Sequence, residues 1–202
     1  MNDRPESDPR NRIRTDREAF RRWNEEMARR YDPDAYHNHP NPLVRAVEQL
    51  RVRKLVRLLD VRASQRVLEV GCGAGNILVR IRAAERCGID LSPRLLEKAR
   101  ARLGSGVDLR EGWAEELPFA DNHFDRVYSS EVIEHVAEPE KVLREMRRVL
   151  KPDGRLVVSF PNEALIDHVK DGLLKTGLWR FFSGDAGEGY VASQRMGDEW
   201  HL

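Results

Sequence analysis

A glycine-rich turn between two short apolar runs constrains this chain more than any other feature. Residues 66–71 form a β-branched and aliphatic run that ends at a glycine cluster, as expected for a buried parallel strand entering a tight turn. Gly71, Gly73 and Gly75 leave this backbone without Cβ atoms, so a ligand can approach it closely. Apolar residues at helical spacing then predict a helix over 76–84, whose first N–H groups face the turn. The pattern therefore predicts a ligand cradle.

An acidic residue ends the next strand, which we expect at 86–90. Asp90 stands nineteen residues after Gly71. In nucleotide-binding α/β folds a carboxylate at this place accepts hydrogen bonds from ribose hydroxyls, because the ends of adjacent strands meet there. A dinucleotide fingerprint would require a glycine at the sixth position, where this chain has Asn76. The sequence therefore predicts a ligand with a ribose and argues against a nicotinamide or flavin dinucleotide.

Strands and helices alternate through the middle of the chain. Besides the elements above, we expect strands at 107–111, 125–129 and 154–160 and helices at 93–103 and 139–150. Such alternation requires a parallel sheet with right-handed crossovers. The expected fold class is α/β, with a parallel sheet sandwiched by helices.

The rest of the chain surrounds this core. We expect a disordered tail at 1–12, an N-terminal helical cap or lid at 13–62, a ligand-binding core at 63–162 and a substrate-side helix and loop at 163–202. Within the cap, helical patterns at 13–30 and 43–59 predict covering helices. The loop between them, 31–42, contains proline, asparagine, tyrosine and histidine. It either closes over a ligand or only connects the two helices.

The composition of the chain argues against several classes of function. The 202 residues carry a formal charge of +1, and both signs are interspersed, so the surface does not suit a polyanion and nucleic acid is not the expected partner. No apolar run approaches the roughly 20 residues of a membrane span. Cys72 and Cys87 fall at positions expected to be buried and predict neither a disulfide framework nor a cysteine metal cluster. We expect a cytoplasmic protein.

Four motifs, in order, carry a resemblance to one family. They are E-V-G-C-G-A-G at 69–75 with G-I-D at 88–90, E-E-L-P-F at 115–119, F-D-R-V-Y-S-S-E-V-I-E-H-V at 124–136 and L-K-P-D-G-R-L-V-V-S at 150–159. Together they resemble the class I S-adenosylmethionine-dependent methyltransferases, in the methyltransferase type 11 group that contains the ubiquinone-pathway enzymes. The resemblance implies a Rossmann-like core that binds S-adenosylmethionine. The last two of the family's usual seven strands are missing here, which implies either a truncated chain or a partner, such as a second copy in a homo-oligomer, over the exposed sheet edge.

The resemblance also implies contacts with the cofactor. The turn at 71–75 would hold its amino acid end, Asp90 its ribose, Leu91 one face of the adenine and the Trp113–Ala114 backbone the adenine edge. The full set of implied cofactor-binding residues is Glu69, Gly71, Cys72, Gly73, Gly75, Asp90, Leu91, Trp113, Ala114 and Ser130. The family usually has Asp where this chain has Trp113, so Trp113 either stacks on the adenine or belongs to the core.

A second constellation lies just past one of the core strands. Glu131, Glu134 and His135 stand at positions i, i+3 and i+4, which would share one helix face near the carboxyl ends of the strands. In some relatives, including the terminal 2′-O-methyltransferases of small RNAs, a similar E-x-x-E-H and a later histidine hold a divalent ion. That likeness implies Mg, Mn or Zn, with His201 as the fourth ligand and His168 in reserve. Alternatively His135 is a general base, or the three residues have a structural role.

These observations lead to one expected function and two alternatives. We expect an S-adenosylmethionine-dependent methyltransferase that acts on a small molecule, with O-methylation favoured over N- or C-methylation. Much of the catalysis would come from aligning acceptor and donor in a water-poor site. The first alternative is a non-catalytic S-adenosylmethionine-binding or scaffold protein, suggested by the missing strands and by Trp113. The second is a metal-dependent RNA 2′-O-methyltransferase.

Overall fold

The computed structural model describes residues 16–30, 34 and 37–160, and the fold is given for these residues. The helices are α2 (Arg17–Arg30), α4 (Pro42–Leu59), α5 (Pro93–Leu103) and α6 (Pro139–Val149). The strands are β1 (Arg66–Val70), β2 (Glu85–Asp90), β3 (Asp108–Glu111), β4 (Phe124–Ser130) and β5 (Leu150–Ser159). Three single 3-10 turns, η1 (Leu78–Arg80), η2 (Gly104–Gly106) and η3 (Ile133–His135), complete the set. The expected tail at 1–12 and the segment 163–202 lie outside the described residues.

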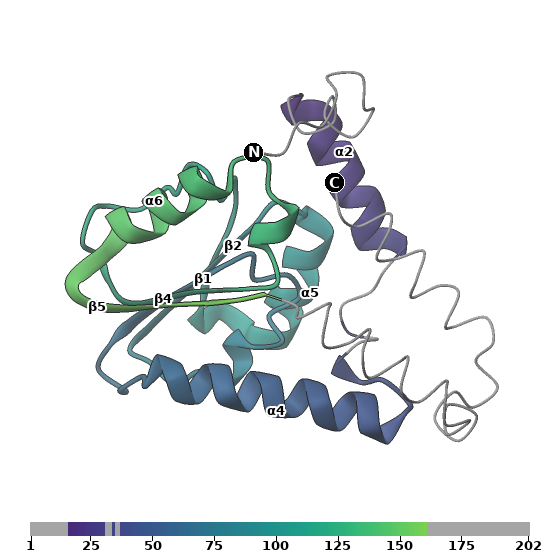
Figure 1. Ribbon diagram of the computed structural model, residues 1–202, viewed down its shortest axis with the longest axis horizontal. Helices are drawn as coiled ribbons and strands as arrows, with labels where there is room; N and C mark the ends of the chain where they lie inside the picture. Colours follow the sequence, from purple (N-terminus) through teal and green to yellow (C-terminus); the bar gives the residue numbers. More distant parts are fainter. Residues whose placement is uncertain (1–15, 31–33, 35–36, 161–202) are drawn as a thin grey trace, which may run out of the picture.

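The strands form one parallel sheet in the order β3-β2-β1-β4-β5. In Figure 1, α6 lies on one side of this sheet and α4 on the other. β1 is buried from Val67 to Val70 because both faces of the sheet are covered. The expected α/β fold with a parallel sheet between helices is therefore confirmed.

Alternate residues of β1 enter two separate apolar layers. Leu68 and Val70 belong to the layer that contains α6 side chains such as Met146. Val67 belongs to the other layer, with Leu55 of α4. This two-residue period is the geometry of a strand, and it fixes which side chains of β1 lie on each face of the sheet.

The helix predicted over 76–84 is wrong. Only the single turn η1 forms there, and Ile81 after it is extended. The reason is distance: the amides of Ala84 and Glu85 donate to the carbonyl of Gln65, so the chain must already be back at the start of β1. The five residues of β1 span about 17 Å, whereas a nine-residue helix covers about 13 Å. Ile77, Leu78 and Ile81 of this segment are buried and Val79 is exposed, but extended backbone is needed to make the crossing.

The remaining predicted elements agree with the structure to within a few residues. β5 begins at Leu150 rather than at 154 because the expected turn is taken up within the strand, with an irregular register against β4. Cys72 and Cys87 are buried free thiols, as expected. Within the described part of the chain, no helix has the length and apolarity that crossing a membrane requires.

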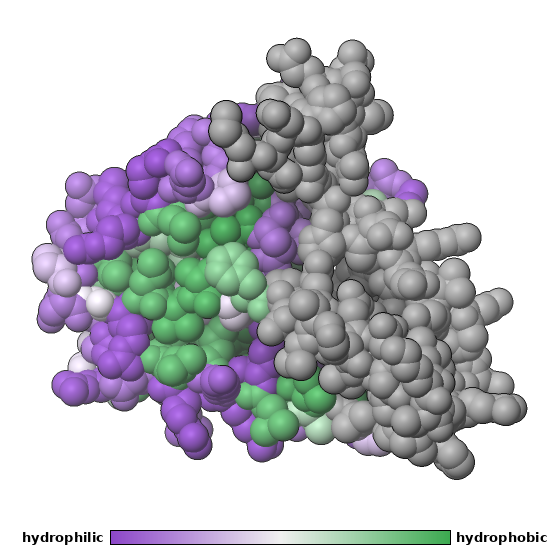
Figure 2. Space-filling view, viewed as in Figure 1, coloured by the Kyte–Doolittle hydropathy of each residue, from purple (hydrophilic) through white to green (hydrophobic). Residues whose placement is uncertain are grey.

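Hydrophobic residues are gathered on one side of the molecule between α6 and α4 (Figure 2). In the described residues β5 is the edge strand there, and its apolar residues 156–158 are partly exposed. Phe160, just beyond the strand, is 56% exposed. A partner over this sheet edge stays a prediction.

Candidate functional site

The glycine turn after β1 adopts a left-handed backbone, which glycine accepts without strain. Gly71, Gly73 and Gly75 have φ angles of 73°, 49° and 74°. A Cβ atom at Gly71 would lie 2.3 Å from Cγ2 of Val132, so the neighbouring loop packs directly on that glycine. At Gly73 the nearest side-chain atom, Cδ1 of Leu95, would be 4.0 Å away. The turn is therefore packed at its first glycine and open at Gly73, where a ligand can approach the backbone.

Asp90 ties the turn to the helix that follows β2. Its Oδ2 accepts a hydrogen bond of 2.7 Å from the Gly73 amide, and its Oδ1 accepts one of 2.9 Å from the Ser92 amide. Burial raises the pKa of Asp90, and these two backbone hydrogen bonds act against that rise. A carboxylate can accept about four hydrogen bonds, so Asp90 retains capacity to accept a further hydrogen bond from a ribose.

Glu69 lies beneath the turn and is only 2% exposed. Burial raises its pKa from 4.5 to about 8. Its Oε2 atom has no hydrogen-bond partner among the described residues. A buried acceptor of this kind beside an open turn fits a ligand that brings a hydrogen-bond donor or a positive charge, as the amino group of S-adenosylmethionine would.

The ends of β2 and β3 are covered by α2. Phe20 of α2 packs on Trp113 with ring centroids 5.8 Å apart, and the Arg17 guanidinium lies 5.1 Å from the centroid of the same indole. Glu25 of α2 accepts a 2.6 Å hydrogen bond from the Ser92 hydroxyl. The side chain of Trp113 is thus engaged with the cap helix, while Leu91 and Ala114 beside it are partly buried. The sequence predicts the covering helix but not these contacts.

The helix face predicted for Glu131, Glu134 and His135 is wrong. Glu131 has a left-handed backbone with φ 56°, and only the 3-10 turn η3 follows it. The Glu131 amide donates to the carbonyl of Ser159, which keeps this residue on the sheet and prevents a helix from starting. Glu134 and His135 remain neighbours, with 4.0 Å between Oε1 and Nε2.

The predicted metal ligands are consequently not gathered at one point. In the described ranges no group of three His, Cys, Asp or Glu side chains could hold a metal ion. Glu131 is turned toward Arg51, with 3.2 Å between Oε1 and Nη1. His201 and His168 lie outside the described residues. A divalent metal stays a prediction that the geometry of these three residues does not support.

A network centred on Arg51 of α4 is the part of the site that sequence reasoning missed. Arg51 donates two hydrogen bonds, of 2.8 and 2.6 Å, to the Glu48 carboxylate, and a further one to the hydroxyl of Ser130. Ser130, expected at the cofactor, also lies 3.0 Å from Ser159, hydroxyl to hydroxyl. Glu48 is 3% exposed, and its Oε1 lies 3.0 Å from Nδ1 of His37. The only sequence signal is the i, i+3 spacing of Glu48 and Arg51.

The Glu48 carboxylate is ionised in this network. Burial alone would raise its pKa, but hydrogen bonds from His37 and Arg51 outweigh burial and lower the pKa from 4.5 to about 2. His37 comes from the loop that the sequence places between the two cap helices. This loop is therefore linked through α4 to the carboxyl ends of β4 and β5.

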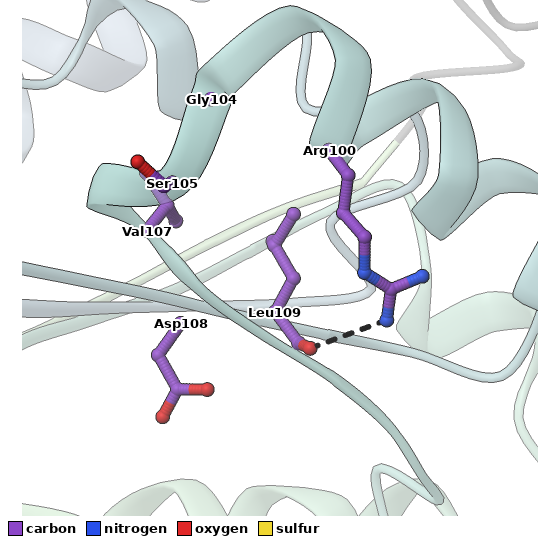
Figure 3. Close-up of a pocket in the computed structure, with 6 residues that line it drawn as sticks. All are labelled: Arg100, Gly104, Ser105, Val107, Asp108 and Leu109. Carbon is purple, nitrogen blue, oxygen red and sulfur yellow. Dashed lines mark hydrogen bonds between the residues drawn. The ribbon is translucent and has the colours of Figure 1, made fainter.

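A separate pocket lies at the outer edge of the sheet. It is lined by Arg100, Gly104, Ser105, Val107, Asp108 and Leu109 (Figure 3). The Arg100 guanidinium is directed to the Leu109 carbonyl, with 3.5 Å between nitrogen and oxygen. The pocket surrounds the start of β3, whereas ligands of parallel sheets bind beyond the carboxyl ends of the strands. It is therefore distinct from the glycine turn.

Comparisons with known sequences point to one family. A family model described as "Methyltransferase domain" matches residues 68–158. Methyltransferase GfsG of Streptomyces halstedii is 39% identical over 59% of this chain and 45% of its own length. The ubiquinone/menaquinone biosynthesis C-methyltransferase UbiE of Azotobacter vinelandii is 34% identical, over 62% of this chain and 54% of its own length. The ubiquinone biosynthesis O-methyltransferase of Cereibacter sphaeroides is 39% identical, over 48% and 41%.

Solved structures agree with this result. The [4+2]-cyclase SpnF superposes with a TM-score of 0.52 and 32% identity, over 56% of this chain and 44% of that chain. The PH0226 protein of Pyrococcus horikoshii OT3 superposes with a TM-score of 0.59 and 27% identity, over 72% and 71%. The chain spans about half the length of the curated relatives that it matches.

Proposed function

We propose that the chain is an S-adenosylmethionine-dependent methyltransferase, because the methyltransferase domain model matches residues 68–158. The observation that carries the proposal is the left-handed glycine turn, open at Gly73 and tied to Asp90 by a 2.7 Å hydrogen bond. The family implies the cofactor, and the turn, the buried Glu69 and Asp90 have the chemistry to hold it. A cytoplasmic location is part of the proposal, supported by the two buried free thiols.

Each end of the cofactor has residues suited to it. The backbone of residues 71–75 would hold the amino acid end, and Glu69 would accept a hydrogen bond from its ammonium group. Asp90 would accept hydrogen bonds from the ribose hydroxyls. Leu91, Trp113 and Ala114 would surround the adenine, with α2 as its cover. When bound, S-adenosylmethionine supplies an electrophilic methyl group on a positively charged sulfur, so the protein has to orient the acceptor and exclude water.

We propose a small molecule as the acceptor and an oxygen as the favoured acceptor atom. The relatives are named for both C-methylation and O-methylation, so their names do not decide between the two. His135 supports oxygen, because an imidazole beside a carboxylate can take the proton of a hydroxyl group. His135 and Glu134 are mostly buried, with side chains 17% and 14% exposed, in the turn that follows β4.

Two alternatives remain as hypotheses. The second candidate is a non-catalytic S-adenosylmethionine-binding or scaffold protein. The similar solved structure of a [4+2]-cyclase supports only the general point that a protein of this fold need not transfer a methyl group. A metal-dependent RNA 2′-O-methyltransferase has less support, since the charge is close to neutral and Glu131 is paired with Arg51.

Calorimetric titration with S-adenosylmethionine and with its demethylated product, S-adenosylhomocysteine, tests the cofactor. The proposal requires binding of both, and a chain that binds neither would exclude it. Turnover on a panel of phenols, sugars and quinol precursors then tests the transfer step. Activity that survives an excess of chelator, with no ion found by elemental analysis, would remove the metal hypothesis and leave His135 as a base or as a structural residue.

A further inference from the structure

We infer that Arg51 is a positioning residue of the cofactor site, which holds Glu131 in a left-handed conformation and thereby keeps the loop after β4 against the glycine turn. The inference rests on the proposed function, because its consequence is cofactor affinity. Arg51 lies outside residues 68–158, the segment that the family model matches. Part of the site is thus assigned to the N-terminal helical segment.

The backbone of Glu131 needs an explanation. Three described residues other than glycine have a positive φ angle, namely Asp60, Asn122 and Glu131. Aspartate and asparagine tolerate this region because their short side chains form local hydrogen bonds, but glutamate has no such preference. A conformation of this kind persists only where its surroundings impose it, and such residues cluster at functional sites.

Two contacts impose the conformation, one on the main chain and one on the side chain. The Glu131 amide donates a 3.0 Å hydrogen bond to the Ser159 carbonyl at the end of β5. The Glu131 carboxylate is 3.2 Å from Nη1 of Arg51, and the same nitrogen donates to the Ser130 hydroxyl. Arg51 is itself fixed, because its planar fork is paired with both oxygens of the buried Glu48.

The conformation of Glu131 reaches the glycine turn through the next residue. Val132 packs so closely over Gly71 that a Cβ atom there would be 2.3 Å from its Cγ2. If Glu131 relaxed to an ordinary conformation, Val132 would leave this position and the turn would lose the surface on which it is packed. Arg51 therefore acts on the cofactor through Glu131 and Val132, and not by touching it.

Titration with S-adenosylhomocysteine of five variants tests this chain of contacts. Removing Arg51 alone would leave the Glu48 charge buried with too little compensation, so Arg51→Met is combined with Glu48→Gln. Glu131→Ala and Glu131→Gly both remove the carboxylate, but only glycine accepts a φ of 56° without strain. The fourth variant combines Glu131→Gly with the two substitutions on α4, and Arg53→Ala, an exposed position of the same helix, is the control. Thermal unfolding of each variant establishes that it is folded.

The inference predicts that the α4 double variant and Glu131→Ala each weaken binding by about tenfold. Glu131→Gly keeps at least about threefold more affinity than Glu131→Ala, and the α4 substitutions add little further loss on that glycine background. Equal losses for alanine and glycine, or an undiminished effect of the α4 substitutions on the glycine background, would overturn the inference. A wild-type chain that does not bind S-adenosylhomocysteine would instead remove the proposed function itself.

Discussion

The two sides of the candidate site are held in place by different means. The glycine turn after β1 is shaped by its own backbone and by Asp90, whose carboxylate bonds to the Gly73 amide. The loop after β4 is held from a distance, by Arg51 of α4 acting on Ser130 and Glu131. The glycine turn can be recognised in the sequence because its residues are close together in the chain. The contact between helix α4 and the end of β4 cannot, because its residues are far apart.

The buried carboxylates on the two sides show the same contrast. Glu69 and Glu48 both have small exposed fractions, 2% and 3%. The pKa of Glu69 is raised to about 8 by burial, while the pKa of Glu48 is lowered to about 2 because hydrogen bonds from His37 and Arg51 outweigh burial. The buried Glu69 side chain is therefore available as an acceptor for a ligand. The buried Glu48 carboxylate is instead paired within the protein.

The largest expected effect is that of Gly71→Val. A side chain there would meet Val132 at 2.3 Å and would also have to adopt a φ of 73°. Backbone strain and overpacking together should lower the free energy of unfolding by about 3 kcal/mol or more. Chemical denaturation measures the loss, with Gly104→Val as a control because nothing lies within 4 Å of a Cβ at that glycine. If both variants lose the same amount, the two loops are not packed together as described.

The second prediction concerns the pH dependence of stability at Glu69. The folded chain holds the Glu69 proton up to about pH 8, and the unfolded chain releases it near its ordinary pKa of 4.5. The contribution of Glu69 is therefore complete below pH 4.5 and is lost as the pH rises to about 8, by a few kcal/mol in order of magnitude. Glu69→Gln should remove this fall. Unfolding free energies of both proteins at a series of pH values measure the difference, and parallel curves would contradict the assignment.

The third prediction concerns Asp90, and its expected effect is smaller than those of the first two. Asp90→Ala removes the acceptor of the Gly73 and Ser92 amides and of the proposed ribose bonds. Charge-assisted hydrogen bonds contribute about 1.5 to 3 kcal/mol each, less what water replaces. The affinity for S-adenosylhomocysteine should fall at least about tenfold, as measured by calorimetry. An unchanged dissociation constant in a folded variant would mean that the ribose lies elsewhere.

The contrast between the two sides also explains what could be predicted from the sequence. The strand, the turn and Asp90 lie in one short stretch, whose glycines and apolar residues predict a strand followed by a tight turn. The structure has that strand and that turn. The helix expected over 76–84 fails because periodicity reports burial and not the distance that a crossover must span. The helix face expected at Glu131 fails because Ser159 and Arg51, far away in sequence, fix that residue. The sequence does not decide the role of Trp113, because the partners of its side chain, Phe20 and Arg17, lie on the cap.

One paired titration tests the central claim, that the turn at Gly73 is the cofactor site, most directly. Gly73→Ala and Gly104→Ala each place a side chain on a left-handed backbone, with φ of 49° and 69°, and neither creates a close contact within the protein. The two variants should lose stability, but only Gly73→Ala should weaken the binding of S-adenosylhomocysteine, by about tenfold or more. Wild-type affinity in Gly73→Ala, or an equal loss of affinity in Gly104→Ala, would contradict the account.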